Sequence, residues 1–176
     1  MKYVLTGGPG VGKTTILNIL KEQGYTVLTE KARSIIEIEQ QKNSNILPWK
    51  DLFLFQQRVV EKQLADEENY NNQDVFCDRS IIDGYAYCKL GKVEIPENVI
   101  KNGFKRYDLV FLLDPLLDYQ NDESRKENLE TAKEIHLAIE QTYRYFGYEP
   151  IKIPVDTPEN RVKIILDIVS NSSKKT

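Results

Sequence analysis

A short segment near the N-terminus constrains the fold of this chain more than any other feature. Residues 7–14 read Gly-Gly-Pro-Gly-Val-Gly-Lys-Thr and fit the phosphate-binding pattern G-x-x-x-x-G-K-[ST] without a substitution. The glycines let the backbone turn its N–H groups inward around an anion. Residues 3–6 predict a buried strand before this loop, and residues 15–20 predict a helix after it, whose N-terminus adds partial positive charge. The chain therefore has to place a strand, an anion-binding turn and a helix in direct succession.

Each part of this P-loop has an expected task in binding a nucleoside triphosphate. Lys13 brings a charge to the β- and γ-phosphates, and the Thr14 hydroxyl can ligate Mg²⁺. The alternative is a glycine-rich turn with a solvated lysine, which the flanking strand and helix disfavour. The residues expected to bind the nucleotide are Gly8, Pro9, Gly10, Val11, Gly12, Lys13, Thr14 and Thr15.

Length and charge limit the classes of function. The chain has 176 residues and a net charge of -3, which indicates one domain and argues against broad nucleic-acid binding, because that requires a basic face. A small phosphorylated ligand in a local positive pocket remains compatible with this charge. No apolar run approaches the roughly 20 residues that span a bilayer, and the chain begins directly with a strand. We expect no membrane span, no signal peptide and a cytoplasmic protein.

Apolar segments alternate with helical ones along the chain. The predicted strands are 2–6, 25–29, 74–78, 108–113 and 150–154, and the predicted helices are 13–23, 31–42, 49–69, 80–89, 96–102, 123–146 and one that begins at Pro158 with Thr157 as its N-cap. The strands lack polar alternation, which is typical of a parallel sheet covered on both faces. We expect residues 1–170 to form one domain and residues 171–176 to be a disordered tail.

Polar residues follow the predicted strands, at the edge where active groups gather in such sheets. Asp78-Arg79-Ser80 follows the third strand. Asp78 can hold Mg²⁺ through water or accept a proton, and Arg79 can stabilise a transferring phosphoryl group. The alternative is an ordinary ion pair with Ser80 capping the next helix. Asp114, after the fourth strand, competes with Asp78 as the magnesium-associated acid; we prefer Asp78 because Arg79 follows it.

The order of these motifs resembles the nucleoside and nucleotide kinases. A closer resemblance is to the group of small P-loop proteins that contain the ribosylnicotinamide kinase domain of NadR, and it covers nearly the whole chain. Besides the P-loop and Asp-Arg-Ser, it is carried by Glu30, Ala32 and Arg33 after the second strand and by Tyr143, Phe146, Gly147, Tyr148, Ile153 and Pro154 near the C-terminus.

The resemblance implies a three-layer P-loop NTPase fold: a five-stranded parallel sheet of order 2-3-1-4-5, flanked by helices and carrying a helical lid. It implies an ATP- and Mg²⁺-dependent phosphotransferase, monomeric or homodimeric, that acts on a nucleoside or nucleotide-like small molecule. Glu30 would position or deprotonate the acceptor hydroxyl, and Arg33 would meet an acceptor phosphate. Lid arginines would fall within residues 116–130, with Arg125 the first choice and Lys126 the second. The alternatives are an exposed pair of Glu30 with Arg33 and a solvated, charged helix face.

A second class of function is a nucleotide-dependent switch or NTPase without a small-molecule acceptor. The sequence has no N-K-x-D tetrapeptide, which Ras-type GTPases use to read guanine, so adenine is favoured. The single histidine, His136, lies among alternating polar and apolar helix residues and is interpreted as a surface or boundary residue.

Overall fold

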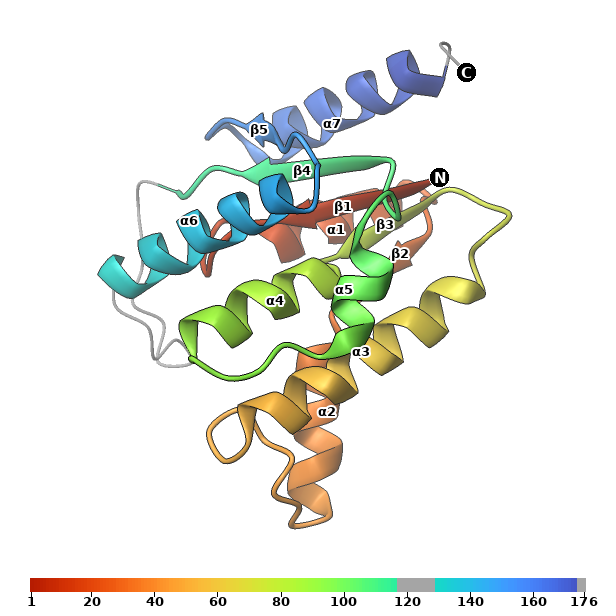
Figure 1. The fold of residues 1–176 in the computed structure, drawn as a ribbon. Helices are drawn as coiled ribbons and strands as arrows, with labels where there is room; N and C mark the ends of the chain where they lie inside the picture. The colour runs from red at the N-terminus through yellow and green to blue at the C-terminus, as the bar shows by residue number, and fades with distance from the viewer. Residues whose placement is uncertain (117–128, 174–176) are drawn as a thin grey trace.

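Five parallel strands form the central sheet of the computed structural model, which describes residues 1–116 and 129–173 (Figure 1). The strands are β1 (Lys2–Thr6), β2 (Val27–Leu28), β3 (Val75–Asp78), β4 (Leu109–Leu113) and β5 (Ile151–Ile153). Their order is β2-β3-β1-β4-β5, which confirms the predicted topology. Strand β2 is shorter than predicted, because only its two residues pair with β3.

Helices cover both faces of this sheet. They are α1 (Lys13–Glu22), α2 (Lys31–Gln41), α3 (Leu52–Glu68), α4 (Ile81–Leu90), α5 (Glu97–Gly103), α6 (Leu129–Tyr145) and α7 (Pro158–Ser173). Helices α1 and α7 pack on one face, and α3 to α6 pack on the other. The ends of α2 and α3 project away from the sheet at the bottom of Figure 1. In the described residues no helix is both long and apolar enough to cross a lipid bilayer.

The two faces of the sheet are filled by alternating side chains of the same strands. On β1, Val4 packs toward α3 to α6, whereas Tyr3 and Leu5 pack toward α1 and α7. On β4, Leu112 and Phe111 divide in the same way. Because both faces are buried, both alternating sets are apolar, which is why the sequence shows continuous apolar runs. Each of these side chains contributes about 1.5–3 kcal/mol by its burial.

The last helix begins as predicted and ends later than predicted. Pro158 is its first residue, and the Thr157 hydroxyl oxygen accepts a hydrogen bond from the N–H of Asn160 at 3.3 Å. At the other end, the Ser172 hydroxyl donates to the carbonyl oxygen of Ile168 at 3.0 Å. Residues 171–173 therefore belong to α7 rather than to the expected disordered tail.

A buried carboxylate fixes the edge of the sheet opposite the P-loop. Glu67 on α3 is fully buried. Its Oε2 accepts a hydrogen bond from the Arg106 guanidinium at 2.6 Å, and its Oε1 accepts from the Tyr107 hydroxyl at 3.0 Å and from the Gln63 amide at 2.8 Å. These bonds tie α3 to the segment that leads into β4. Both oxygens of the carboxylate accept hydrogen bonds, so we interpret this cluster as stabilising the fold.

We expect the substitution Glu67→Gln to lower the free energy of unfolding by about 2 kcal/mol, because it removes the charge that the half-buried Arg106 faces. Urea denaturation measures the change. The control is Glu97→Gln, which breaks an exposed pair with Lys101 and should leave the midpoint unchanged. Equal midpoints for both variants would contradict a stabilising role for the buried cluster.

Candidate functional site

The predicted functional segments meet at the carboxyl edge of the sheet. The P-loop follows β1, Glu30 follows β2, and Asp78 is the last residue of β3. In the pairing of β1 with β3, Leu5 lies opposite Asp78, so the acid stands beside the residues that enter the P-loop. The parallel arrangement brings these strand ends together although they are far apart in the sequence.

The P-loop adopts a backbone that glycine favours. Gly10 and Gly12 have φ angles of 77° and 84°, in the left-handed region that costs other residues free energy. Gly12 is the N-cap of α1 and has no side chain with which to satisfy the first amides of the helix. The hydroxyl groups of Thr14 and Thr15 are exposed beside it. This helix terminus is therefore open to an anion.

Lys13 lies among charges that do not balance. Burial and the neighbouring Arg79 lower the pKa of Lys13 to about 8, against the opposing effect of Asp78, Glu30 and Asp83. Burial is the main cause of this shift, and an anion bound at the helix terminus would stabilise the charged ammonium group directly. The site thus favours a ligand with several negative charges.

Arg79 links the end of β3 to the P-loop. Its guanidinium donates to Glu30 Oε1 at 3.0 Å, to Asp83 Oδ1 at 3.0 Å and to the carbonyl oxygen of Gly7 at 3.2 Å. It also lies 5.5 Å from the centre of the Tyr87 ring. Burial lowers the pKa of Arg79, but Tyr87 and the neighbouring carboxylates raise it further, so the guanidinium stays charged. Its φ angle of 64° is unusual for a residue other than glycine and is held by these contacts.

Asp83 is a buried member of the site that the sequence interpretation missed. Its Oδ1 accepts from the Thr6 hydroxyl at 2.6 Å as well as from Arg79, and its Oδ2 accepts from the Ser80 N–H at 2.9 Å and the Tyr143 hydroxyl at 2.6 Å. One carboxylate therefore connects β1, the β3–α4 turn and α6. Ser80 and Asp83 also form a capping box at the start of α4, and that three-residue spacing is the signal that could have found it.

The carboxylate of Asp78 has the chemistry of a metal ligand. Its Oδ1 is buried and has no hydrogen-bond partner among the described residues. Burial, with smaller contributions from Glu30 and other carboxylates, raises the pKa of Asp78 to about 6 although Lys13 opposes this. Mg²⁺ prefers oxygen ligands and keeps several waters or phosphate oxygens, so Asp78 and the Thr14 hydroxyl fit such an ion. No cluster of three or more His, Cys, Asp or Glu side chains with metal-binding geometry occurs within residues 1–116 and 129–173.

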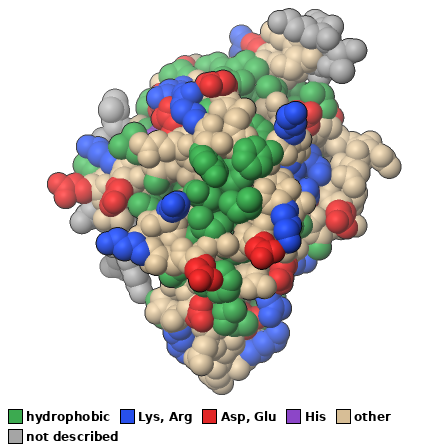
Figure 2. Space-filling model, in the orientation of Figure 1, with side chains coloured by type: hydrophobic (Ala, Val, Ile, Leu, Met, Phe, Trp, Pro, Cys, Tyr) green, Lys and Arg blue, Asp and Glu red, His purple; other side chains and the backbone are tan. Residues whose placement is uncertain are grey.

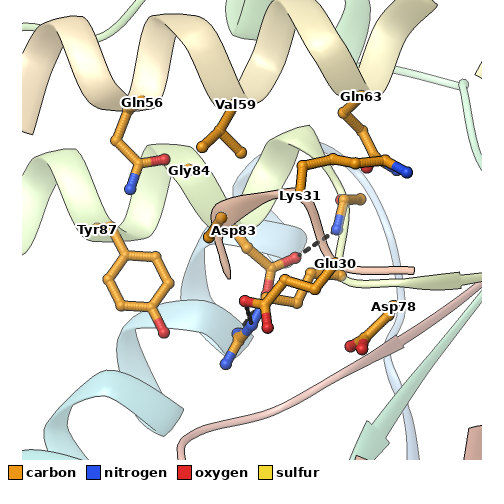
Figure 3. A pocket seen from close by; sticks show the side chains of 12 residues that line it. Glu30, Lys31, Gln56, Val59, Gln63, Asp78, Asp83, Gly84 and Tyr87 are labelled. Atoms are coloured by element: carbon orange, nitrogen blue, oxygen red, sulfur yellow. Dashed lines mark hydrogen bonds and ion pairs between the residues drawn. The ribbon is translucent and has the colours of Figure 1, made fainter. Parts of the chain in front are cut away.

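A cleft opens beside these residues, between α3 and α4 (Figure 3). Its free interior volume is about 40 Å³, and it opens to solvent. Lys31, which lies in it, is paired with Asp66 at 2.9 Å. Figure 3 shows Gln56, Val59 and Gln63 reaching from α3, and Tyr87 from α4. The lining residues are Glu30, Lys31, Ala32, Gln56, Val59, Gln63, Asp78, Arg79, Ser80, Asp83, Gly84 and Tyr87.

Of the residues predicted to act on the acceptor or to form the lid, one does not line this cleft and two lie outside the described residues. Arg33 is exposed on α2 and is not among the lining residues, so its role in binding an acceptor phosphate stays a prediction. Arg125 and Lys126, together with most of the predicted lid, lie outside the described residues. Glu30 pairs with Arg79 rather than with Arg33, which differs from the alternative interpretation of this glutamate.

Arg161 braces the P-loop from the side of β4 and β5, a role that no sequence motif indicated. It is the largest fully buried side chain of the described residues, with 2% exposed. Its guanidinium donates to the carbonyl oxygens of Val11 at 2.8 Å, Asp114 at 3.2 Å and Ile153 at 3.2 Å. The ends of β4 and β5 are thereby fixed to the loop. No local spacing indicates this contact, because its partners come from three separate segments.

His136 also contacts the P-loop, so its interpretation as a surface or boundary residue was wrong. Its side chain is buried, and its Nδ1 accepts a hydrogen bond from the N–H of Gly8 at 3.2 Å. The alternating pattern around it belongs to α6, whose buried face rests on the loop. The pairing spans more than a hundred residues of sequence and left no local signal.

The raised pKa of Asp78 gives a stability prediction. A carboxyl whose pKa is raised in the folded state stabilises the fold below its unfolded value of 3.8, and this contribution is lost as the pH rises through about 6. At about pH 8 the ionised carboxylate therefore destabilises the protein, and Asp78→Asn should raise the free energy of unfolding by about 1–2 kcal/mol. Urea denaturation at about pH 8 and pH 5 tests this; a gain equally large at both pH values would contradict it.

Comparisons with known proteins agree with this geometry. A search of curated proteins finds no match. Among solved structures, a deoxyadenosine kinase from M. mycoides with dCMP and dCDP bound has a TM-score of 0.63 and 19% identity, with 97% of this chain and 100% of that chain covered. A NadR protein in complex with NR has a TM-score of 0.67 and 20% identity, with 97% of this chain and 51% of that chain covered.

These likenesses confirm the fold of the P-loop nucleoside kinases. A family model described as "AAA domain" matches residues 2–161, from the first strand to the arginine that braces the P-loop. The chain therefore belongs to this AAA domain family.

Proposed function

We propose that the protein is a kinase that uses ATP and Mg²⁺ to phosphorylate a hydroxyl group of a nucleoside-like small molecule. One observation carries this proposal: Lys13, at the uncapped N-terminus of α1, lies close enough to Asp78, Arg79 and Glu30 of the cleft for their charges to act on its pKa, and the buried Oδ1 of Asp78 has no partner in the described structure. A separate cleft beside the phosphate-binding loop offers a place for an acceptor, which hydrolysis alone does not need. The nucleoside kinase fold of the structural neighbours supports the same function.

Each charged group then has a role in phosphoryl transfer, which depends on positioning and charge stabilisation. The amides at the start of α1 and Lys13 hold the β- and γ-phosphates. Thr14 and Asp78 would hold Mg²⁺, which would neutralise charge on the phosphates. Arg79, which donates a hydrogen bond to Gly7 of the P-loop, stabilises the transferring phosphoryl group. Glu30, which is paired with Arg79, positions the acceptor hydroxyl. Arg125 would approach from the segment after β4.

The charges of the cleft favour an acceptor without a phosphate. Its lining contains two cations, Lys31 and Arg79, and both are already paired with carboxylates. It also contains three carboxylates, Glu30, Asp78 and Asp83. Among the described lining residues no cation is left unpaired, so a phosphomonoester would enter this environment at a considerable cost in desolvation. We therefore propose a nucleoside rather than a nucleotide as the acceptor; Arg33 is the candidate phosphate ligand in the opposite case.

Incubation with ATP, Mg²⁺ and pooled nucleosides should produce a nucleoside monophosphate, detected by mass spectrometry. Lys13→Ala should lower the turnover by about 10³-fold or more, because it removes the charge that holds the transferring phosphates. The control is Lys21→Ala, at the exposed end of α1, which should keep the wild-type rate. ATP hydrolysis that no acceptor changes would instead favour the switch or NTPase, and full activity of Lys13→Ala would contradict the proposed site.

The two candidate acids can be separated by substitution. Asp78 acts on the pKa of Lys13, whereas Asp114 acts on that of His136, on the other side of the P-loop. We expect Asp78→Asn to abolish Mg²⁺-dependent turnover and Asp114→Asn to retain most of it, measured as initial rates over a series of Mg²⁺ concentrations. Loss of Mg²⁺ dependence in Asp114→Asn alone would reverse the assignment.

A further inference from the structure

The single histidine of the chain serves one amide of the P-loop. His136 is 7% exposed, and its Nδ1 accepts the hydrogen bond from Gly8. A backbone N–H can only donate, so Nδ1 must carry a lone pair and the proton of the neutral ring must be on Nε2. The hydrogen bond thus selects one tautomer and one charge state of the imidazole.

Helix α6 and the loop are in close contact at this point. A Cβ atom at Gly8 would lie 2.8 Å from the carbonyl oxygen of Ala132 and 3.0 Å from the Cβ of His136, which leaves no space for a side chain. The backbone of the helix therefore sets the distance between His136 and the loop. A side chain at position 8 would push the helix away and break the contact with the imidazole, so glycine is required here.

The orientation of Gly8 decides which amides remain for an anion. Its N–H points to His136, and the following residue, Pro9, has no N–H. The donors left to surround phosphate oxygens are those from Gly10 to Thr14. We propose that His136 is a positioning residue of the nucleotide site: it fixes the peptide at Gly8, so that the later amides of the loop face the phosphates. This inference rests on the proposed binding of ATP.

Protonation of His136 would end this contact, because an Nδ1–H would face the N–H of Gly8. Burial lowers the pKa of His136 from its usual 6.5, so the ring is neutral at neutral pH. The charged groups that act on it are Asp114 after β4 and Glu140 on α6, which raise its pKa, and Lys152 on β5 and Lys13 on α1, which lower it. Since the folded pKa is the lower one, the contact is intact above 6.5 and is lost as the pH falls through the folded value.

Two substitutions distinguish the effect of the hydrogen-bond acceptor Nδ1 from the effect of the volume of the ring. His136→Asn can place an acceptor oxygen near the position of Nδ1 and does not titrate, whereas His136→Leu fills similar space without an acceptor. Calorimetry with ATP and Mg²⁺ at about pH 7.5 should give a Kd about five- to tenfold higher for His136→Leu, the effect of one lost hydrogen bond. The asparagine variant should stay within about twofold of the wild type. Leu137→Asn, at the exposed neighbouring position, is the control and should bind like the wild type.

A second titration, at a pH below the folded pKa of His136 as located by the pH dependence of its NMR signals, gives a result that a packing role would not produce. The wild type should lose more affinity between the two pH values than His136→Asn, which has no ring to protonate. The terminal phosphate of ATP also takes up a proton in this range, and the comparison of the two proteins cancels that effect. Equal losses, or equal weakening by asparagine and leucine at about pH 7.5, would overturn the proposal.

The wild-type protein supplies a test that no folding defect can obscure. As the chain has one histidine, its imidazole nitrogens give a single pair of NMR signals. They should report the tautomer with hydrogen on Nε2, and the other tautomer would overturn the proposal. If the wild type binds ATP and all variants bind it equally, the role of His136 is refuted while the proposed function stands. If the folded wild type binds no ATP, both fail.

Discussion

Two positive charges beside the P-loop, on Lys13 at the start of α1 and on Arg79 after β3, set the conditions for the rest of the structure. Their mutual repulsion and their burial are unfavourable, and the protein compensates only in part. Arg79 receives two carboxylates and a carbonyl oxygen, whereas Lys13 is left with a lowered pKa. An enzyme that binds a polyphosphate has reason to keep such an imbalance, because the ligand completes the charge balance of the site.

The edge of the sheet that carries the P-loop lies opposite an edge at which the buried polar groups are hydrogen-bonded. At the opposite edge of the sheet, Glu67 has a partner for each oxygen, and Arg106 is matched by it. At the P-loop edge, Asp78 keeps a buried oxygen without a partner, and Arg79 keeps a left-handed backbone. Both clusters combine a buried carboxylate, an arginine and a tyrosine, but only the second leaves a group free for a ligand. Such local instability is typical of functional sites and is compensated by the packed faces of the sheet.

Sequence reasoning found the parts of the site that depend on short spacings. The P-loop and the Asp78-Arg79 pair are local motifs, and the alternation of strands and helices placed them at the same edge of the sheet. The contacts that hold these motifs in place could not be found in this way. His136 and Arg161 reach the loop from α6 and α7, and their partners are backbone groups that have no sequence signature. The helix bounds were predicted to within a few residues because caps and prolines mark them, as at Pro158; the exception is α6, predicted from residue 123 and described from Leu129 onwards.

The proposed function depends on the binding of a nucleoside triphosphate by the turn between β1 and α1. The most direct measurement is a calorimetric titration of the folded wild-type protein with a non-hydrolysable ATP analogue and Mg²⁺. We expect saturable binding of a single nucleotide per chain, and we expect this binding to weaken when a chelator removes Mg²⁺. A folded sample that takes up no nucleotide, with or without Mg²⁺, would contradict it.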